Sequence, residues 1–131
     1  LDIEAGEPVW EYITQDPFEY TEDFIVGPSS IYIRSSAYAF VLDKATGEKV
    51  WDFKWTSATG VNPIYLGGFV YLSNHYTIFI LDAETGELVH EEPLPNGGGY
   101  FWELAASDSL LFAQTSSQII AYEPWHLREV R

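Results

Sequence analysis

The stretch from Leu42 to Trp51 reads LDKATGEKVW, and the stretch from Leu81 to His90 reads LDAETGELVH. Both contain the pattern Asp-x-x-Thr-Gly-Glu, and Asp82 follows Asp43 by 39 residues. A weaker copy, LDIEAGEPVW, opens the chain, and a degenerate copy lies between Tyr122 and Val130. A period near 40 residues is typical of arrays of one structural unit, so this repeat decides the architecture.

Short apolar runs lie between the copies of the motif. They cover residues 9–13, 24–26, 31–34, 38–42, 63–66, 69–72, 77–81, 102–106, 110–113 and 118–122. Turns rich in Gly, Ser, Pro and Asn separate many of them, which is typical of antiparallel β-hairpins. No segment shows sustained helical periodicity, and aromatic residues, which favour strands, make up 17% of the chain. We therefore predict an all-β fold.

The repeated motif has the chemistry of a tight turn. Gly47 and Gly86 can adopt positive φ without steric cost. The side chains four and one residues before each glycine are Asp and Thr, which can accept hydrogen bonds from nearby backbone amides. An aromatic residue, Trp51, begins the strand after the first turn, and His90 takes that place after the second. We expect these side chains to pack against the neighbouring unit.

Four strands in each unit of about 40 residues are typical of a β-propeller blade. The motif also resembles the tryptophan-docking repeat of the pyrroloquinoline-quinone-like propellers, whose pattern is roughly Ala-x-Asp-x-x-Thr-Gly-x-x-x-Trp. The matching positions are Asp43, Thr46, Gly47 and Trp51 in one copy, Asp82, Thr85 and Gly86 with His90 in place of Trp in the next, and Asp2, Gly6 and Trp10 with Ala5 in place of Thr in the first. The resemblance implies that these residues form the turns and dock one blade on the next.

The repeat divides the chain into a partial first blade, about 1–15, and three blades, about 16–55, 56–95 and 96–131. Closed propellers have about four to eight blades, so we expect an incomplete ring. The ring could be completed by a second copy, by another polypeptide, or by further blades if this chain is part of a larger propeller. In the two-chain version, the strand around Trp10 completes the partner's last blade, because an open sheet edge invites pairing.

Composition excludes several classes of function. The net charge is −14 with only six Lys and Arg, which argues against binding to nucleic acid or to anionic lipid. The chain has no Cys, which excludes disulfides, iron–sulfur clusters and thiol catalysis, and no apolar run approaches the ~20 residues that span a bilayer. Because Met is absent too, we expect the N-terminus to arise by cleavage, such as removal of a signal peptide, or by excision from a longer chain. We expect the protein to lie outside the cytoplasm, in the periplasm, at the cell surface or secreted.

Catalytic motifs are not evident in the sequence. The three histidines, His75, His90 and His126, do not have the spacing of metal ligands, and no Gly-x-Ser-x-Gly or phosphate-binding loop occurs. Clusters of carboxylates, such as 19–23, are typical of a solvated surface in an acidic chain. The dehydrogenases of the resembled family need eight blades around a calcium-held quinone. We therefore expect no catalytic residues, no metal, no cofactor and no enzyme activity.

Aromatic residues supply the candidates for partner binding. Tyr100, Phe101 and Trp102 follow the glycine-rich stretch 96–99, and Trp55 ends a second aromatic group. Exposed aromatic residues dominate protein interfaces, but alternate rings could instead fill the space between blades. We predict a non-catalytic interaction or scaffold module that binds a protein partner or a copy of itself. The alternative is a fragment of a quinone-dependent dehydrogenase or a carbohydrate-binding propeller.

Overall fold

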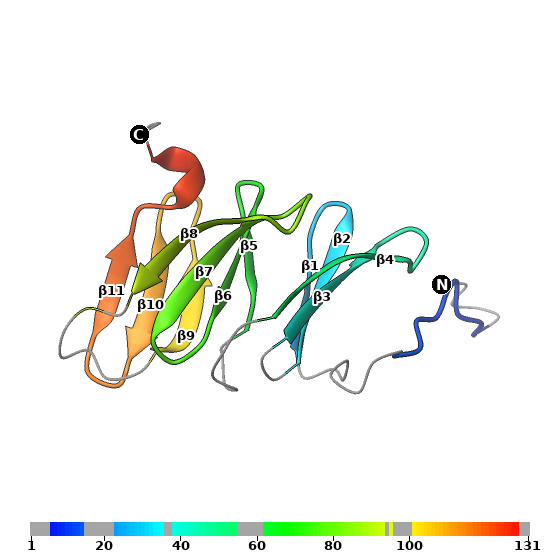
Figure 1. The fold of residues 1–131 in the computed structure, drawn as a ribbon, viewed down its shortest axis with the longest axis horizontal. Helices are drawn as coiled ribbons and strands as arrows, with labels where there is room; N and C mark the ends of the chain where they lie inside the picture. The colour runs from blue at the N-terminus through cyan, green and yellow to red at the C-terminus, as the bar shows by residue number, and fades with distance from the viewer. Residues whose placement is uncertain are drawn as a thin grey trace.

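The computed structural model describes residues 6–14, 23–35, 38–54, 62–93, 95 and 101–128 (Figure 1). These residues form an all-β chain with one short 3-10 helix, which confirms the predicted fold class. The elements are β1 (Asp23–Val26), β2 (Ser30–Ser35), β3 (Tyr38–Asp43), β4 (Lys49–Lys54), β5 (Ile64–Leu66), β6 (Phe69–Ser73), β7 (Thr77–Asp82), β8 (Leu88–Pro93), β9 (Phe101–Ala106), β10 (Leu111–Thr115), β11 (Ile119–Tyr122) and η1 (Trp125–Leu127).

The strands form three antiparallel sheets in chain order. The first sheet contains β1 to β4, the second β5 to β8 and the third β9 to β11, and strands that follow one another in sequence are neighbours in the sheet. Figure 1 shows the sheets side by side along the long axis, with the N-terminal segment at one end and the third sheet at the other. The described strands thus form a row of separate open sheets, which is the arrangement of consecutive propeller blades.

Two parts of the chain depart from the predicted four-stranded pattern. The third sheet has three strands among the described residues, and most of its predicted fourth strand, residues 127–131, lies outside them. The prediction of a strand at residues 9–13 is wrong, because these residues belong to none of the three sheets. A strand needs a neighbour that satisfies its backbone groups, and no strand in the described part of the chain pairs with this segment.

The central strands of the first two sheets are buried on both faces. Along β3, Tyr38, Phe40 and Leu42 pack on one side with Trp10 and Tyr12 of the N-terminal segment. Ala39 and Val41, which alternate with them, pack on the other side against the second sheet. Successive side chains of a strand point to opposite faces, so burial of both faces explains the uninterrupted apolar runs of β3 and β7.

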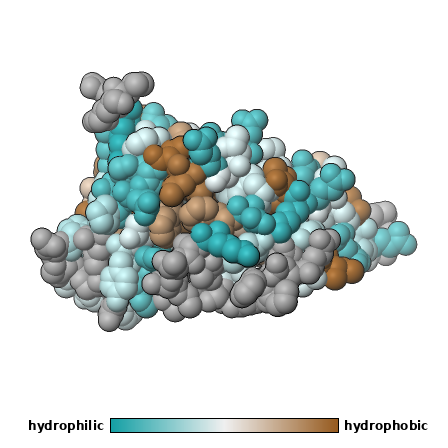
Figure 2. Space-filling model, viewed as in Figure 1, coloured by the Kyte–Doolittle hydropathy of each residue, from teal (hydrophilic) through white to brown (hydrophobic). Residues whose placement is uncertain are grey.

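The third sheet buries only one face. Phe101, Leu104, Leu111 and Ala113 pack against Tyr71, Ile78 and Ile80 of the second sheet. The residues that alternate with them along β9 are exposed. In the view of Figure 2, apolar residues form small separate groups on a largely hydrophilic surface, in keeping with the strongly acidic composition.

Candidate interaction site

The first Asp-x-x-Thr-Gly motif forms a closed turn between β3 and β4. The Asp43 carboxylate accepts hydrogen bonds from the amides of Ala45 (2.8 Å) and Thr46 (3.0 Å), and these bonds lower its pKa. The Gly47 amide donates to the Asp43 carbonyl (2.8 Å), and Gly47 has a φ of 77°. The Thr46 hydroxyl accepts from the Glu48 amide (3.2 Å), so both polar side chains of the motif hold the bend.

The second motif builds the same turn between β7 and β8. The Asp82 carboxylate accepts from the amides of Glu84 (2.8 Å) and Thr85 (3.2 Å), and the Thr85 hydroxyl accepts from Glu87 (3.2 Å). Gly86 has a φ of 79° and donates to the Asp82 carbonyl at 2.8 Å. Equal bonds at equal positions show that the repeat in sequence is a repeat in backbone geometry.

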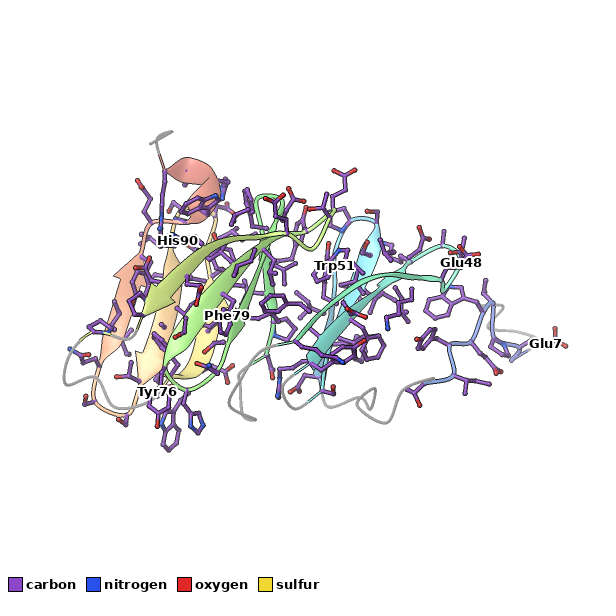
Figure 3. All side chains as sticks on the ribbon, viewed as in Figure 1. Glu7, Glu48, Trp51, Tyr76, Phe79 and His90 are labelled. Atoms are coloured by element: carbon purple, nitrogen blue, oxygen red, sulfur yellow. The ribbon has the colours of Figure 1, made fainter. Side chains whose placement is uncertain are left out.

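Trp51 joins the first sheet to the turn of the second. Its indole Nε1 donates to the Ala83 carbonyl at 3.0 Å. The indole also lies flat on Gly86, where an added Cβ would meet its Cδ2 at 2.6 Å. Gly86 is therefore required both for its positive φ and for the close approach of the ring. Figure 3 shows Trp51 between the two sheets, with Phe79 on the facing strand.

Trp10 makes the corresponding contact from the N-terminal segment to the first sheet. Its Nε1 donates to the Lys44 carbonyl at 3.0 Å, and its ring lies on Gly47, where a Cβ would meet Cε3 at 2.5 Å. Tyr12 adds a ring contact to Phe40 at 5.7 Å. Gly6 of the same motif has a φ of 69° but no neighbouring atom near a built Cβ, and Asp2 lies outside the described residues.

His90 occupies the position of the docking tryptophan in the second sheet. Its ring stacks on Trp125 with centroids 4.7 Å apart and an interplanar angle of 21°. The Arg128 guanidinium also lies over the Trp125 ring, with its carbon 5.2 Å from the ring centroid. The same guanidinium forms an ion pair with the Glu92 carboxylate at 3.1 Å. The Trp125 amide donates to the Tyr71 hydroxyl at 2.7 Å. Sequence reasoning missed Trp125, because this tryptophan does not occupy the motif's Trp position.

The candidates for partner binding have different surroundings. Phe101 is 1% exposed and packs between the second and third sheets. It therefore fills the space between two blades, which was the alternative to partner binding. Trp102, by contrast, is 63% exposed on β9. Tyr100 and Trp55 lie outside the described residues.

The outer face of the third sheet is exposed, whereas the corresponding faces of the first and second sheets are each buried against the following sheet. Ile119 lies four residues before Glu123, the counterpart of Asp82, just as Ile78 lies four residues before Asp82. Ile78 and the corresponding Ala39 of β3 are 0% and 3% exposed, whereas Ile119 is 78% exposed. Ala39 and Ile78 each face the following sheet, so Ile119 lies where a following sheet would pack.

A hollow of about 410 Å³ opens between the first two sheets beside their turns. Tyr32 and Tyr65, whose rings stack at 5.7 Å, line it together with Asp43, Asp82 and Glu84. Asp43 and Asp82 already accept backbone hydrogen bonds in the two turns. Within the described residues, no group of three or more His, Asp or Glu side chains is placed to hold a metal ion.

These observations define the class of protein: an all-β chain whose antiparallel sheets pack face to face as propeller-type blades. Comparison with solved structures agrees with this class. The chain is similar to BamB from Moraxella catarrhalis, with a TM-score of 0.63 and 17% identity over 75% of this chain and 29% of that one. It is also similar to a europium-containing methanol dehydrogenase, with a TM-score of 0.67 and 13% identity over 93% of this chain and 26% of that one.

A third similar structure is the glutaminyl cyclase of Myxococcus xanthus, with a TM-score of 0.55 and 12% identity over 80% of this chain and 48% of that one. No family model and no curated protein sequence matches the chain. The chain spans less than half the length of each of these three structures. At these low identities, the likeness shows a β-propeller-like fold alone. No helix among the described residues is long and apolar enough to cross a membrane.

Proposed function

We propose that this chain is a non-catalytic interaction or scaffold module, located outside the cytoplasm, that binds a protein through the outer face of its third sheet. The observation that supports the proposal is the exposure of Ile119, at a repeat position that is buried in both other sheets. Exposed apolar surface of this kind is costly in water and marks protein interaction sites. The module's rigid part is the stack of three sheets, and the binding part is its last face.

The side chains on this face suit a protein partner. In the register of β10 with its neighbours, Phe112 pairs with Ala105 and Ala121, so these three side chains share the outer face with Ile119. Trp102, beside them on β9, adds a large exposed aromatic surface. Aromatic and aliphatic anchors surrounded by polar residues are typical of the energetic centre of a protein interface.

The alternative function is a fragment of a quinone-dependent dehydrogenase or a carbohydrate-binding propeller. The similarity to the europium-containing methanol dehydrogenase, which covers 93% of this chain, favours it at the level of fold. The hollow lined by Tyr32 and Tyr65 is the place where a small molecule would bind, because aromatic faces and carboxylates line it.

The two functions are separated by binding measurements on the purified chain. We expect it to form a particle larger than one 14.9 kDa chain in light scattering, because the apolar face associates. Ile119→Asp should weaken this association at least about tenfold, since it places a charge in the buried centre of an interface. Tyr76→Asp, at an exposed residue between β6 and β7 of the second sheet, is the matched control and should leave association unchanged.

The contrary result is equally clear. If the chain stays monomeric at all concentrations, and pyrroloquinoline quinone or a monosaccharide raises its melting temperature saturably, the scaffold proposal is wrong. Absorbance of a bound quinone at one equivalent per chain would identify the dehydrogenase alternative. A Tyr65→Ala variant then tests whether the hollow is the binding site.

A further inference from the structure

We propose that residues 7–14 of a second copy of this chain add a fourth strand to the third sheet, along the edge of β11. The inference rests on the proposed function and names the partner and the contact. In the described part of the chain, β11 is an edge strand, while the corresponding strands β3 and β7 each pair with a fourth strand.

Within residues 123–128, the described part of the chain after β11, the backbone does not return along that strand. The returns after β3 and β7 depend on Gly47 and Gly86, which have φ of 77° and 79°. Leu127 holds the corresponding position after β11, and a residue with a side chain rarely adopts positive φ. The backbone forms η1 there instead, with the Leu127 amide bonded to the Pro124 carbonyl at 3.0 Å.

Contacts of this C-terminal segment draw it toward the second sheet. Trp125 stacks on His90 of β8, and Arg128 pairs with Glu92 of the same strand at 3.1 Å. His126 lies directly against Gly67, in the turn between β5 and β6. Figure 1 shows η1 beyond the end of β11. The described part of this segment therefore leaves the edge of β11 open.

The N-terminal segment has the sequence of a fourth strand. Trp10 follows Gly6 by four residues, as Trp51 follows Gly47 at the beginning of β4. Trp10 also makes the fourth-strand contact, because it docks on Gly47 in the way that Trp51 docks on Gly86. The segment thus holds the place of an outer strand from a preceding sheet. Apart from an isolated β-bridge at Glu7, it belongs to no sheet among the described residues.

The open edge of β11 and the N-terminal segment cannot meet within one chain. They lie at opposite ends of the long axis of the molecule in Figure 1. A second copy can bring its N-terminal end to the third sheet of the first. The contact is heterologous, so it either closes on itself or continues as a filament. Two copies that exchange segments would form a ring of about six blades, within the size range of closed propellers.

The repeat predicts the register of this pairing. In the first sheet, Val41 pairs with Trp51 and Phe40 with Asp52, and in the second, Ile80 pairs with His90 and Phe79 with Glu91. Transferred to the third sheet, the same register places Trp10 opposite Ala121 and Glu11 opposite Ile120.

This register also turns the correct faces toward each other. Trp10 would share a face with Ala121 and Ile119, and that face is the uncovered one. Trp10 and Tyr12 already pack on the first sheet of their own chain. The first sheet of one copy would therefore cover the outer face of the third sheet of the other, and Ile119 would become buried as Ile78 is.

Electrostatics opposes this assembly and gives it a recognisable salt dependence. Each chain carries a net charge of −14, so two copies repel each other over the distance of the Debye length. Apolar contacts at β11 supply the attraction, because its four residues, Ile-Ile-Ala-Tyr, are uncharged. Association should therefore strengthen when NaCl is raised from low to physiological concentration.

Cysteine cross-linking tests the contact directly, because the natural chain has no Cys. A tagged Glu11→Cys chain is mixed with an Ile120→Cys chain under mild oxidation. Opposed residues of an antiparallel pair have Cα atoms about 4.5–5.5 Å apart, within reach of a disulfide. We expect the mixed dimer to form at least about tenfold faster than with Gln118→Cys, which shifts the thiol two residues along the strand and out of reach.

The outcomes separate this inference from the function on which it rests. A mixed disulfide specific to Ile120→Cys, lost when Ile119→Asp is added to the same chain, supports it. If Ile119→Asp abolishes association but the two cysteine positions cross-link equally fast, the strand contact is wrong. The proposal of an interaction module is then still supported. A chain that stays monomeric and is unaffected by Ile119→Asp contradicts both proposals.

Discussion

The first three strands of the second and third sheets are paired in the same order, but only the second sheet is covered on both faces. Ile78 and Ile119 hold the same repeat position, and their exposed fractions are 0% and 78%. The difference is in the neighbours, because the third sheet follows the second and no described sheet follows the third. A large apolar side chain at this exposed position is therefore what we expect of a face that a binding partner covers.

The contacts between sheets provide the largest test of this comparison. Trp51→Ala removes a half-buried indole that joins the first sheet to the turn of the second, together with its hydrogen bond to Ala83. We expect the free energy of unfolding to fall by about 3 kcal/mol, the range found for large-to-small changes at buried aromatic residues. Urea denaturation monitored by circular dichroism measures it.

Trp102→Ala is the matched control, because the same side chain is removed from the uncovered sheet. It should change the free energy of unfolding of the single chain by no more than about 0.5 kcal/mol. Equal losses for Trp51→Ala and Trp102→Ala would show that packing between the sheets does not account for the stability of the fold. A loss for Trp102→Ala that depends on protein concentration would place it in the interface.

The glycines of the turns give a smaller effect of the same kind. Gly86 and Gly68 have φ of 79° and 88°, but only Gly86 lies against an indole ring. Gly68→Ala meets only the conformational cost of positive φ, about 1 kcal/mol, while Gly86→Ala must also displace Trp51. We expect a total loss of about 2 kcal/mol for Gly86→Ala, measured by the same denaturation experiment.

A suppressor variant checks the cause of that difference. In a Trp51→Ala background the indole is absent, so Gly86→Ala should cost no more than Gly68→Ala does. The two substitutions at residues 51 and 86 would then be strongly non-additive, as expected for residues in contact. Simple additivity would mean that the strain lies in the backbone alone.

Sequence could predict the parts of this fold that depend on local chemistry. The two turns follow from Asp, Thr and Gly at fixed spacing, because the hydrogen bonds that these three residues make within each turn join residues no more than five apart. The strands of the sheets follow from short apolar runs between turn residues. The repeat at a period near 40 residues then gave the packing of one unit on the next, which neither a turn nor a strand predicts by itself.

The parts that sequence did not predict depend on distant neighbours. Residues 9–13 have the composition of a strand but lack a strand partner among the described residues. Trp125 reaches His90 from a degenerate copy of the motif, through a 3-10 turn that no periodicity indicates. Phe101 and Trp102 are neighbours in sequence, and only the sheet register shows that one is buried and the other exposed.

The smallest expected effect is on stability at alkaline pH, and it comes from a difference between one end of the first sheet and the same end of the third. Tyr38 donates to Asp52 at 2.8 Å and accepts from the Lys49 ammonium at 2.8 Å, whereas Gln118 holds the corresponding position after β10. Burial, with the Asp52 carboxylate beside it, raises the pKa of Tyr38 to about 12. The unfolded chain would ionise this tyrosine near its usual pKa of 10.

The raised pKa fixes the sign of the alkaline stability. Because Tyr38 stays neutral in the folded chain, its contribution is fully present below pH 10 and is lost as the pH rises toward 12. Tyr38→Phe should flatten the fall in stability between these values, while Tyr76→Phe, at an exposed tyrosine, should leave it unchanged. Thermal unfolding followed from pH 8 to 11 makes the comparison, and parallel curves for the natural chain and Tyr38→Phe would show that the first sheet gains nothing from this buried hydroxyl.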